Sequence, residues 1–205
     1  MSTKDKQTEF IQAMNFRHAC KLFDTLKIIN EEDRDYILEV GRLSPSSRGL
    51  EPWDFLVIQS MEMKQKLQLA CLNQPQVGTA SFNIVILAKT KDLHPGSPYM
   101  NTMLERFGVN KEQKTIAYRE FYERVADVKL WCMNQCFISA ANMMTAAAFI
   151  GIDSCPIGGF EEDKVKSLFK LKDEDVALII CFGYRAKEQR SKYRRVFEDV
   201  VKFVD

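Results

Sequence analysis

Residues 130–150 form the most apolar segment of the chain, and apolar side chains occur on nearly every face of the helix that they would make. A helix without a polar face has to be surrounded by other parts of a protein. Its centre, ISAANMMTAAAFIGI, spans about 15 residues and contains Asn142 and Thr145, so it is too short and too polar to cross a membrane. The segment therefore predicts a buried core helix, and Gly151 is a suitable C-terminal stop.

The rest of the chain is long enough to cover such a helix. With 205 residues, of which 46% are hydrophobic and 28% charged, it is expected to form one domain over residues 1–205. The net charge of +1 gives no reason to expect binding to nucleic acid or to an anionic membrane. The first ten residues, MSTKDKQTEF, have no apolar core of the kind that a signal peptide needs, so a cytoplasmic protein is expected.

Periodicity and capping residues divide the chain into helices and strands without a regular β-α repeat, which favours an α+β fold. Asn30 and Ser60 are the predicted N-caps of two helices. The predicted helices are 6–14, 30–42, 60–72, 99–107, 111–126, 130–150 and 161–170, and the predicted strands are 54–59, 83–89, 153–157 and 176–184.

Two basic segments could bind an anion. Arg17 and Lys21 are four residues apart near the N-terminus, and a second basic run, Lys192-Tyr193-Arg194-Arg195, precedes the apolar segment VFEDVVKFV. An arginine and a lysine can grip a phosphate together. The alternative readings are an ordinary solvated turn for the first segment and a disordered tail for the second, although VFEDVVKFV is too apolar for a solvated tail.

Two further segments join predicted elements and contain small residues. The stretch SPSSRGLEPW, residues 44–53, offers hydroxyls at Ser46 and Ser47 and a glycine at position 49. The stretch PIGGF, residues 156–160, places paired glycines ahead of a helix, where backbone N–H groups are free to donate. Both fit equally well as plain connecting turns, and neither matches a dinucleotide-binding or P-loop motif.

The six cysteines form no C-x-x-C pair, and the two histidines, His18 and His94, are far apart, so no metal site is expected. Most of the thiols are expected to be reduced and buried. Cys20, flanked by basic residues, is the one thiol whose surroundings could favour reactivity, and Cys132 and Cys136 lie close together at i,i+4 spacing.

Taken in order, five segments resemble the FMN-dependent nitroreductase family, the oxygen-insensitive NAD(P)H nitroreductases. They are RHACKLFD, RLSPSSRGLEPWDFLVI, NQPQVGTASFNIVILAK, QCFISAANMMTAAAFIGIDSCPIGGFEEDKV and KYRRVFEDVVKFV, and they span nearly the whole chain except residues 95–128. The resemblance implies a small, mainly antiparallel sheet wrapped by helices. It also implies a homodimer, with the C-terminal segment exchanged as a strand onto the partner's sheet and FMN at the subunit interface.

The resemblance assigns FMN contacts to matching residues. It implies that Arg17 holds the FMN phosphate with Lys192 and Arg194, and that Lys21 and Asn73 reach the pyrimidine side of the flavin. It implies that the loop after residue 44 reaches the FMN held by the other subunit. The cofactor-binding residues expected on this basis are Arg17, His18, Ala19, Lys21, Pro45, Ser46, Ser47, Gly49, Leu50, Asn73, Gln76, Pro156, Ile157, Gly158, Gly159, Lys192 and Arg194.

Three positions depart from what the family often carries. Ala19 stands where many members have a serine, Gln76 aligns near a lysine beside the flavin in some members, and Gly158 replaces a glutamate of others. Ala19 removes one hydroxyl from the phosphate site. Because the role of position 158 is largely backbone, we expect flavin binding to survive these changes.

The implied chemistry is carried by the flavin, so no catalytic side chain is assigned. In the family, NADH or NADPH passes a hydride to the flavin N5, and a nitroaromatic, quinone or related oxidant then takes two electrons in the same place. Three alternatives stay open from the sequence. They are other flavin chemistry on this fold, such as reductive dehalogenation or flavin reduction, a redox sensor using Cys20 or the Cys132/Cys136 pair, and a dimeric interaction module without flavin.

Overall fold

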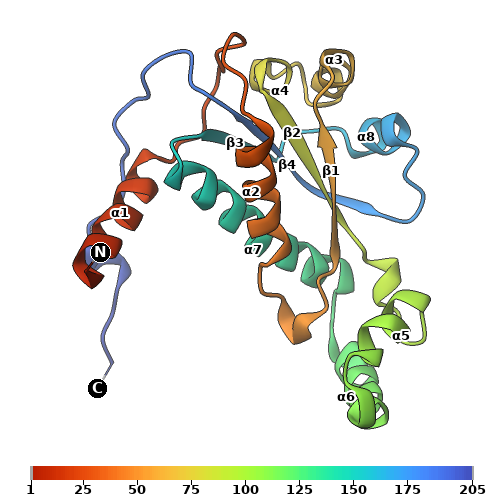
Figure 1. Ribbon diagram of the computed structural model, residues 1–205. Coiled ribbons are helices and arrows are strands. Elements are labelled where there is room, and N and C mark those ends of the chain that lie inside the picture. The colour runs from red at the N-terminus through yellow and green to blue at the C-terminus, as the bar shows by residue number, and fades with distance from the viewer. Residues whose placement is uncertain (1, 205) are drawn as a thin grey trace.

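A four-stranded antiparallel sheet forms the centre of the computed structural model, which describes residues 2–204 (Figure 1). The strands are β1 (Trp53–Ile58), β2 (Phe82–Ala88), β3 (Asp153–Ile157) and β4 (Asp175–Gly183), in the order β1-β2-β4-β3. Each of them coincides with a predicted strand to within one residue at either end. The two central strands, β2 and β4, are buried along nearly their whole length, as their continuous apolar sequences require.

Helices cover both faces of this sheet. They are α1 (Thr3–Phe16), α2 (Glu31–Arg42), α3 (Met61–Ala70), α4 (Pro75–Thr79), α5 (Pro98–Glu105), α6 (Lys111–Arg124), α7 (Val128–Phe149), α8 (Glu162–Phe169) and α9 (Phe197–Val200). Figure 1 shows the long helix α7 running across one face beside α2, while α3, α4 and α8 lie on the other face.

Alternate residues of the strands point into two cores. Ile84 and Ile86 of β2 join the core under α2 and α7, whereas Val85 and Leu87 join the core under α3 and α8. The predicted central helix is confirmed as α7, which buries residues such as Cys136, Ala140 and Met143. Gly151 follows this helix with φ +77°, in the left-handed conformation that glycine adopts without strain.

The predicted N-caps are confirmed. The Asn30 side chain accepts a hydrogen bond from the Asp33 N–H at 2.8 Å, and the Ser60 hydroxyl accepts one from the Met63 N–H at 3.3 Å. Helix α4 has no counterpart among the predicted elements. It is only one turn long and begins at Pro75, so it has no apolar repeat by which it could be recognised.

Both ends of the chain lie on one side of the molecule, where the C-terminal segment runs past α1 and away from the sheet (Figure 1). After Gly183 this segment contains the short helix α9 and otherwise irregular backbone. It pairs with no strand in residues 2–204, and the exchange of a strand with a partner subunit stays a prediction. No helix in the described part of the chain has the length and hydropathy that a membrane span requires.

Candidate functional site

The segment from Arg17 to Asp24 is held between β3 and the chain that follows β4. The Cys20 N–H donates to the Ser154 carbonyl oxygen at 3.0 Å, and the Asp24 N–H donates to the Tyr184 carbonyl oxygen at 2.8 Å. The Ala186 N–H donates back to Leu22 at 3.1 Å. The fold therefore brings the basic segment near the N-terminus against the beginning of the basic tail.

The three predicted phosphate-binding cations, Arg17, Lys192 and Arg194, lie near one another at this place. Burial, together with the positive charges of Arg17 and Arg194, lowers the pKa of Lys192 below its ordinary value. The three cations are therefore close enough to repel one another. The Lys192 ammonium donates to the Met14 carbonyl oxygen at the end of α1. Within residues 2–204, none of the three has a carboxylate oxygen within 4.0 Å, so their charges are not neutralised by the protein.

A cavity of about 520 Å³ is lined by residues that adjoin these cations in the sequence, among them His18 after Arg17 and Ser191 before Lys192. His18 lies at its wall with both ring nitrogens against carbonyl oxygens, Nδ1 at 2.7 Å from Phe16 and Nε2 at 3.0 Å from Arg190. The imidazole therefore ties α1 to the tail across the cavity. The lining residues are His18, Ala19, Lys21, Leu22, Lys187, Glu188, Gln189, Arg190 and Ser191.

Lys21 connects this cavity to the end of β3. Its Nζ lies 3.8 Å from the Cys155 sulfur. Burial raises the pKa of the Cys155 thiol, while Lys21 and the Gln76 side chain act in the opposite direction. Gln76 itself is buried and donates to the Gln74 Oε1 at 3.0 Å, so it belongs to the same group of side chains.

The glycine segment after β3 faces the turn between α3 and α4. The Gln74 Nε2 donates to the Gly159 carbonyl oxygen at 2.8 Å. The N–H groups of Gly158 and Gly159 make no hydrogen bond within residues 2–204, and neither does the Asn73 side-chain amide. Asn73 is left-handed, with φ +57°, and exposed. This edge of the sheet therefore offers unpaired donors to a ligand.

The loop from Pro45 to Leu50 lies elsewhere. Figure 1 shows it at the end of α2 opposite to the Arg17–Asp24 segment. The Ser47 N–H donates to the Gln135 Oε1 of α7 at 2.8 Å, and the Ser46 hydroxyl accepts from the Glu51 N–H at 2.8 Å. Within one chain the structure does not bring this loop to the other predicted cofactor-binding residues.

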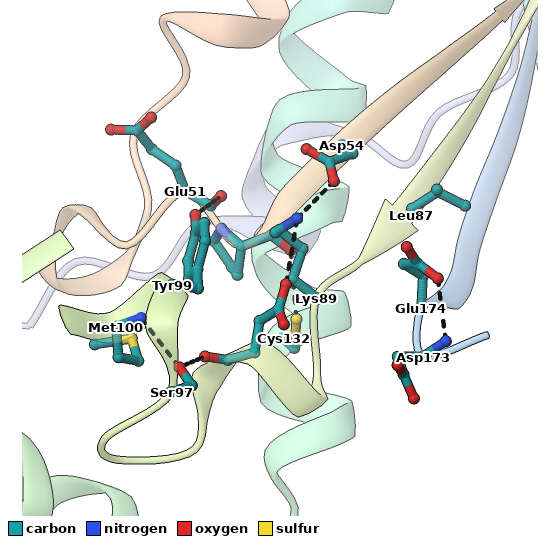
Figure 2. A network of polar contacts seen from close by, with 12 residues as sticks. Glu51, Asp54, Leu87, Lys89, Ser97, Tyr99, Met100, Cys132, Asp173 and Glu174 are labelled. Atoms are coloured by element: carbon teal, nitrogen blue, oxygen red, sulfur yellow. Dashed lines mark hydrogen bonds and ion pairs between the residues drawn. The ribbon is translucent and has the colours of Figure 1, made fainter. Parts of the chain in front are cut away.

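A polar network fixes the end of this loop, at Leu50 and Glu51, to α5 (Figure 2). The Tyr99 hydroxyl lies 2.7 Å from the carbonyl oxygens of Leu50 and Glu51, and the Lys89 ammonium lies 5.2 Å above the Tyr99 ring. Burial lowers the pKa of Lys89, but its ion pairs with Asp54 at 2.6 Å and Asp92 outweigh burial and leave the pKa raised.

The thiols do not have the surroundings that a reactive cysteine needs. Cys20 is fully buried, and burial raises its pKa, so the expectation from its basic neighbours is wrong. Cys132 and Cys136 are also buried, and both sulfurs lie against the Pro52 carbonyl oxygen, at 3.5 and 3.7 Å. Among residues 2–204, no cluster of His, Cys, Asp and Glu has a metal-binding arrangement.

Sequence reasoning missed several side chains that shape these two regions. Gln74 and Cys155 support the glycine segment, Gln135 holds the loop after α2, and Asp153 pairs with Arg185. For Cys155 and Gln74 the sequence offers one signal, which is that each adjoins a predicted site segment. Cys155 directly precedes PIGGF, and Gln74 directly follows Asn73. Gln135 and Asp153 carry no such signal, since their partners are far away in the sequence.

Comparisons with known proteins identify the family of the chain. The model of the "Nitroreductase family" matches residues 14–184. The "Putative NAD(P)H nitroreductase YfkO" of Bacillus subtilis is 38% identical to this chain, covering 98% of this chain and 99% of that protein. A Staphylococcus epidermidis protein, "Putative NAD(P)H nitroreductase SERP2086", is 41% identical, covering 95% of this chain and 96% of that protein.

Solved structures show the same fold. A structure described as a "putative nitroreductase in complex with FMN" from Exiguobacterium sibiricum is 27% identical, with a TM-score of 0.80, and the match covers 95% of this chain and 97% of that one. A "putative NAD(P)H:FMN oxidoreductase" from Staphylococcus epidermidis has a TM-score of 0.82 at 25% identity, with 95% of each chain covered. The chain described here therefore belongs to the nitroreductase family.

Proposed function

We propose that this protein is an FMN-dependent oxidoreductase that uses NADH or NADPH to reduce nitroaromatic, quinone or related acceptors by a ping-pong mechanism. Membership of the nitroreductase family supports the reaction class, and the FMN complex of a relative supports the cofactor. One observation of this chain carries the proposal. Arg17, Lys192 and Arg194 gather without a carboxylate partner within residues 2–204, and such a cluster suits an anionic group.

The residues of the site fit FMN. The three cations suit a dianionic phosphate, and the adjoining cavity of about 520 Å³ is bordered by Lys21. The unpaired amides of Gly158 and Gly159 and the unpaired side chain of Asn73 suit the hydrogen-bonding edge of an isoalloxazine ring. Gly158 is exposed, with no atom near the position of a Cβ, so a flat ring could approach the backbone closely there.

FMN, when bound, supplies a centre that accepts a hydride at N5 and returns two electrons to an acceptor. The chain's own residues bind and orient this group. Lys21 brings a positive charge to the end of β3, and the cations near α1 hold the phosphate end. We assign no side chain as a catalytic acid or base, and solvent supplies the protons.

We further propose that the active form is a homodimer in which the loop from Pro45 to Leu50 borders the FMN held mainly by the other subunit. Its separation from the remaining site residues within one chain supports this proposal (Figure 1). Exposed apolar side chains on α1, α7 and the C-terminal segment support it as well, because large unpaired apolar surfaces mark interfaces. They are Phe10, Ile11, Phe137, Ile138, Phe149, Val196, Phe197, Phe203 and Val204.

The absorption spectrum of the purified protein tests the cofactor, and oxidation of NADH and NADPH with menadione or nitrofurazone tests the reaction. We expect a flavin spectrum and turnover of both kinds of acceptor.

Substitution of the cations tests the phosphate site. Arg17→Ala and Lys192→Ala should each weaken FMN binding about tenfold to hundredfold, the scale of a hydrogen bond to a charged group. Lys6→Ala, an exposed lysine of α1, is the matched control. Unchanged FMN affinity in both site variants would contradict the proposal.

A further inference from the structure

A second cavity, of about 220 Å³, lies between the loop after α2 and helices α5 and α6. It shares no lining residue with the cavity beside His18. Leucine and aromatic side chains make most of its wall, and two cations complete it. The lining residues are Arg48, Leu50, Leu104, Phe107, Lys114 and Tyr118. Of its lining residues, only Leu50 is among the FMN contacts expected from the family resemblance, and those contacts assign no role to the two cations.

Neither cation of this cavity has an acidic partner among residues 2–204. The Arg48 guanidinium carbon lies 4.4 Å from the centre of the Phe121 ring, and the Lys114 Nζ lies 5.5 Å from the centre of the Phe107 ring. In the described part of the chain, no carboxylate oxygen lies within 4.0 Å of either charge, and no acidic residue lines the cavity. Arg48 and Lys114 therefore remain available to an anionic ligand.

Neighbouring cations of the same elements behave differently. Arg106 donates to the Glu51 carboxylate at 2.8 Å and to the Gly49 carbonyl oxygen at 3.0 Å, and Lys111 pairs with Glu105. These contacts hold the loop against α5, and they pair the carboxylates of Glu51 and Glu105 with Arg106 and Lys111. The cations that remain unpaired within the described residues, Arg48 and Lys114, line the cavity.

The backbone at Arg48 is unusual in a way that favours a role for its side chain. Its φ of 60° and ψ of 10° lie in the left-handed region, which a residue with a Cβ adopts at a cost. A glycine would fit this turn without strain, and the next residue in the chain is one. In this conformation the guanidinium lies over Phe121 of α6, and Arg48 forms part of the cavity wall.

We propose that this cavity is a subsite for the carboxylate of an aromatic electron acceptor. The arginine fork matches a carboxylate in geometry, and the lysine adds a second charge. The leucine and aromatic walls suit the ring that carries the carboxylate. The proposal rests on the proposed function, because Leu50 lines the cavity and also belongs to the loop that we place beside the partner's FMN.

Kinetics with a matched pair of acceptors tests this subsite. We compare 4-nitrobenzoate with its uncharged methyl ester, using the purified holoenzyme, the double variant Arg48→Gln/Lys114→Gln and the control Arg119→Gln, which removes a charge from α6 outside the cavity. The double variant should raise KM for the acid about tenfold more than it raises KM for the ester, because only the acid carries the charge that the two cations would bind. Arg119→Gln should leave both KM values unchanged.

Direct binding gives a readout that does not depend on turnover. Calorimetric titration of 4-nitrobenzoate should show an affinity about tenfold lower in the double variant than in the wild type and in Arg119→Gln. Arg48→Gly, which keeps the fold by removing the backbone strain, should share part of this loss. If no acceptor is turned over, the proposed function fails, and the titration alone decides whether the subsite exists.

Three results would overturn the subsite. The first is an equal loss for the acid and the ester, and the second is an equal loss in Arg119→Gln. The third is a KM increase for NADPH, but not for NADH or 4-nitrobenzoate, because the cations would then bind the phosphate of the reductant instead of the acceptor.

Discussion

Lys170 ends α8 in the left-handed conformation, with φ 54° and ψ 37°, although it has a Cβ. Its N–H donates to the Lys166 carbonyl oxygen and closes the last turn. Glycine adopts this conformation without the steric cost, so Lys170→Gly should raise the free energy of unfolding by about 0.5–1 kcal/mol. Urea denaturation measures this change. Lys170→Ala keeps the strain and should give no gain, and an equal gain from alanine would contradict the explanation.

If Lys192 binds the FMN phosphate as proposed, the affinity for FMN should depend on pH. Burial and the charges of Arg17 and Arg194 lower its pKa below the ordinary 10.5, so it loses its proton earlier than a free lysine as the pH rises. Because only the protonated form attracts the phosphate, FMN affinity should decrease as the pH rises through this lowered pKa. Fluorescence titration of FMN between about pH 7 and pH 10 measures the decrease.

Lys192→Arg is the matched variant, because an arginine stays charged throughout this range. Its FMN affinity should fall less with pH than that of the wild type. An identical decrease in both proteins would assign the pH dependence to another group.

At the scale of elements, Tyr99 couples α5 to the loop after α2 (Figure 2). Burial raises the pKa of its hydroxyl, which therefore remains a donor to the carbonyl oxygens of Leu50 and Glu51. Tyr99→Phe leaves these acceptors without their donor and should lower the free energy of unfolding by about 1–2 kcal/mol. Hydrogen exchange at the Gly49 and Glu51 amides should also become faster.

The control for Tyr99 is Tyr36→Phe, because the exposed Tyr36 hydroxyl makes no hydrogen bond within residues 2–204. Tyr36→Phe should leave stability and loop exchange as in the wild type. If Tyr99→Phe changed stability without changing exchange in the loop, the hydroxyl would not be what fixes it.

Local signals predicted most elements because each signal lies within a few residues of the element it defines. The capping side chains Asn30 and Ser60 and the continuous apolar run of β2 are such signals. Left-handed residues such as Arg48 and Lys170 could not be predicted, because neither is a glycine or an asparagine. Their conformations depend on the elements packed around them.

At the scale of the whole molecule, one ion pair joins the beginning of the C-terminal segment to the sheet. Arg185 donates to both oxygens of the buried Asp153 carboxylate, at distances between 2.7 and 3.1 Å, and its guanidinium carbon lies 4.3 Å from the centre of the Phe16 ring. Asp153→Asn breaks this pair and should lower the free energy of unfolding by about 3 kcal/mol. Thermal and urea denaturation measure the loss.

Asp173→Asn is the comparison for this ion pair, because Asp173 pairs with Lys91 at the surface, where screening makes such pairs weak. It should unfold like the wild type. If both variants lost the same stability, burial of Asp153 would not be the cause.

The convergence of the candidate site could be expected only from the resemblance to a family. Arg17 and Lys192 are separated by most of the chain, and no periodicity links them. Their approach depends on the antiparallel order of the strands and on contacts such as Asp153 with Arg185, which form only once the sheet exists. The cavity at Arg48 could not be predicted for the same reason, since its wall combines a loop with two helices from a region that matches the family poorly.

The proposed dimer makes a prediction that separates assembly from cofactor contacts. Removal of residues 196–205 takes away exposed apolar side chains such as Phe203 and Val204, which are 85% and 92% exposed, but keeps Lys192 and Arg194. If this segment packs on a partner subunit, the shortened chain should be a monomer in sedimentation velocity and should lose FMN, because the loop from Pro45 to Leu50 then borders no cofactor.

Point variants of the same segment test the same contact. Phe203→Glu/Val204→Glu should weaken the dimer, whereas Lys202→Glu, which changes the net charge by the same amount, should not. A monomer that retains FMN with full affinity would show that one chain completes the site.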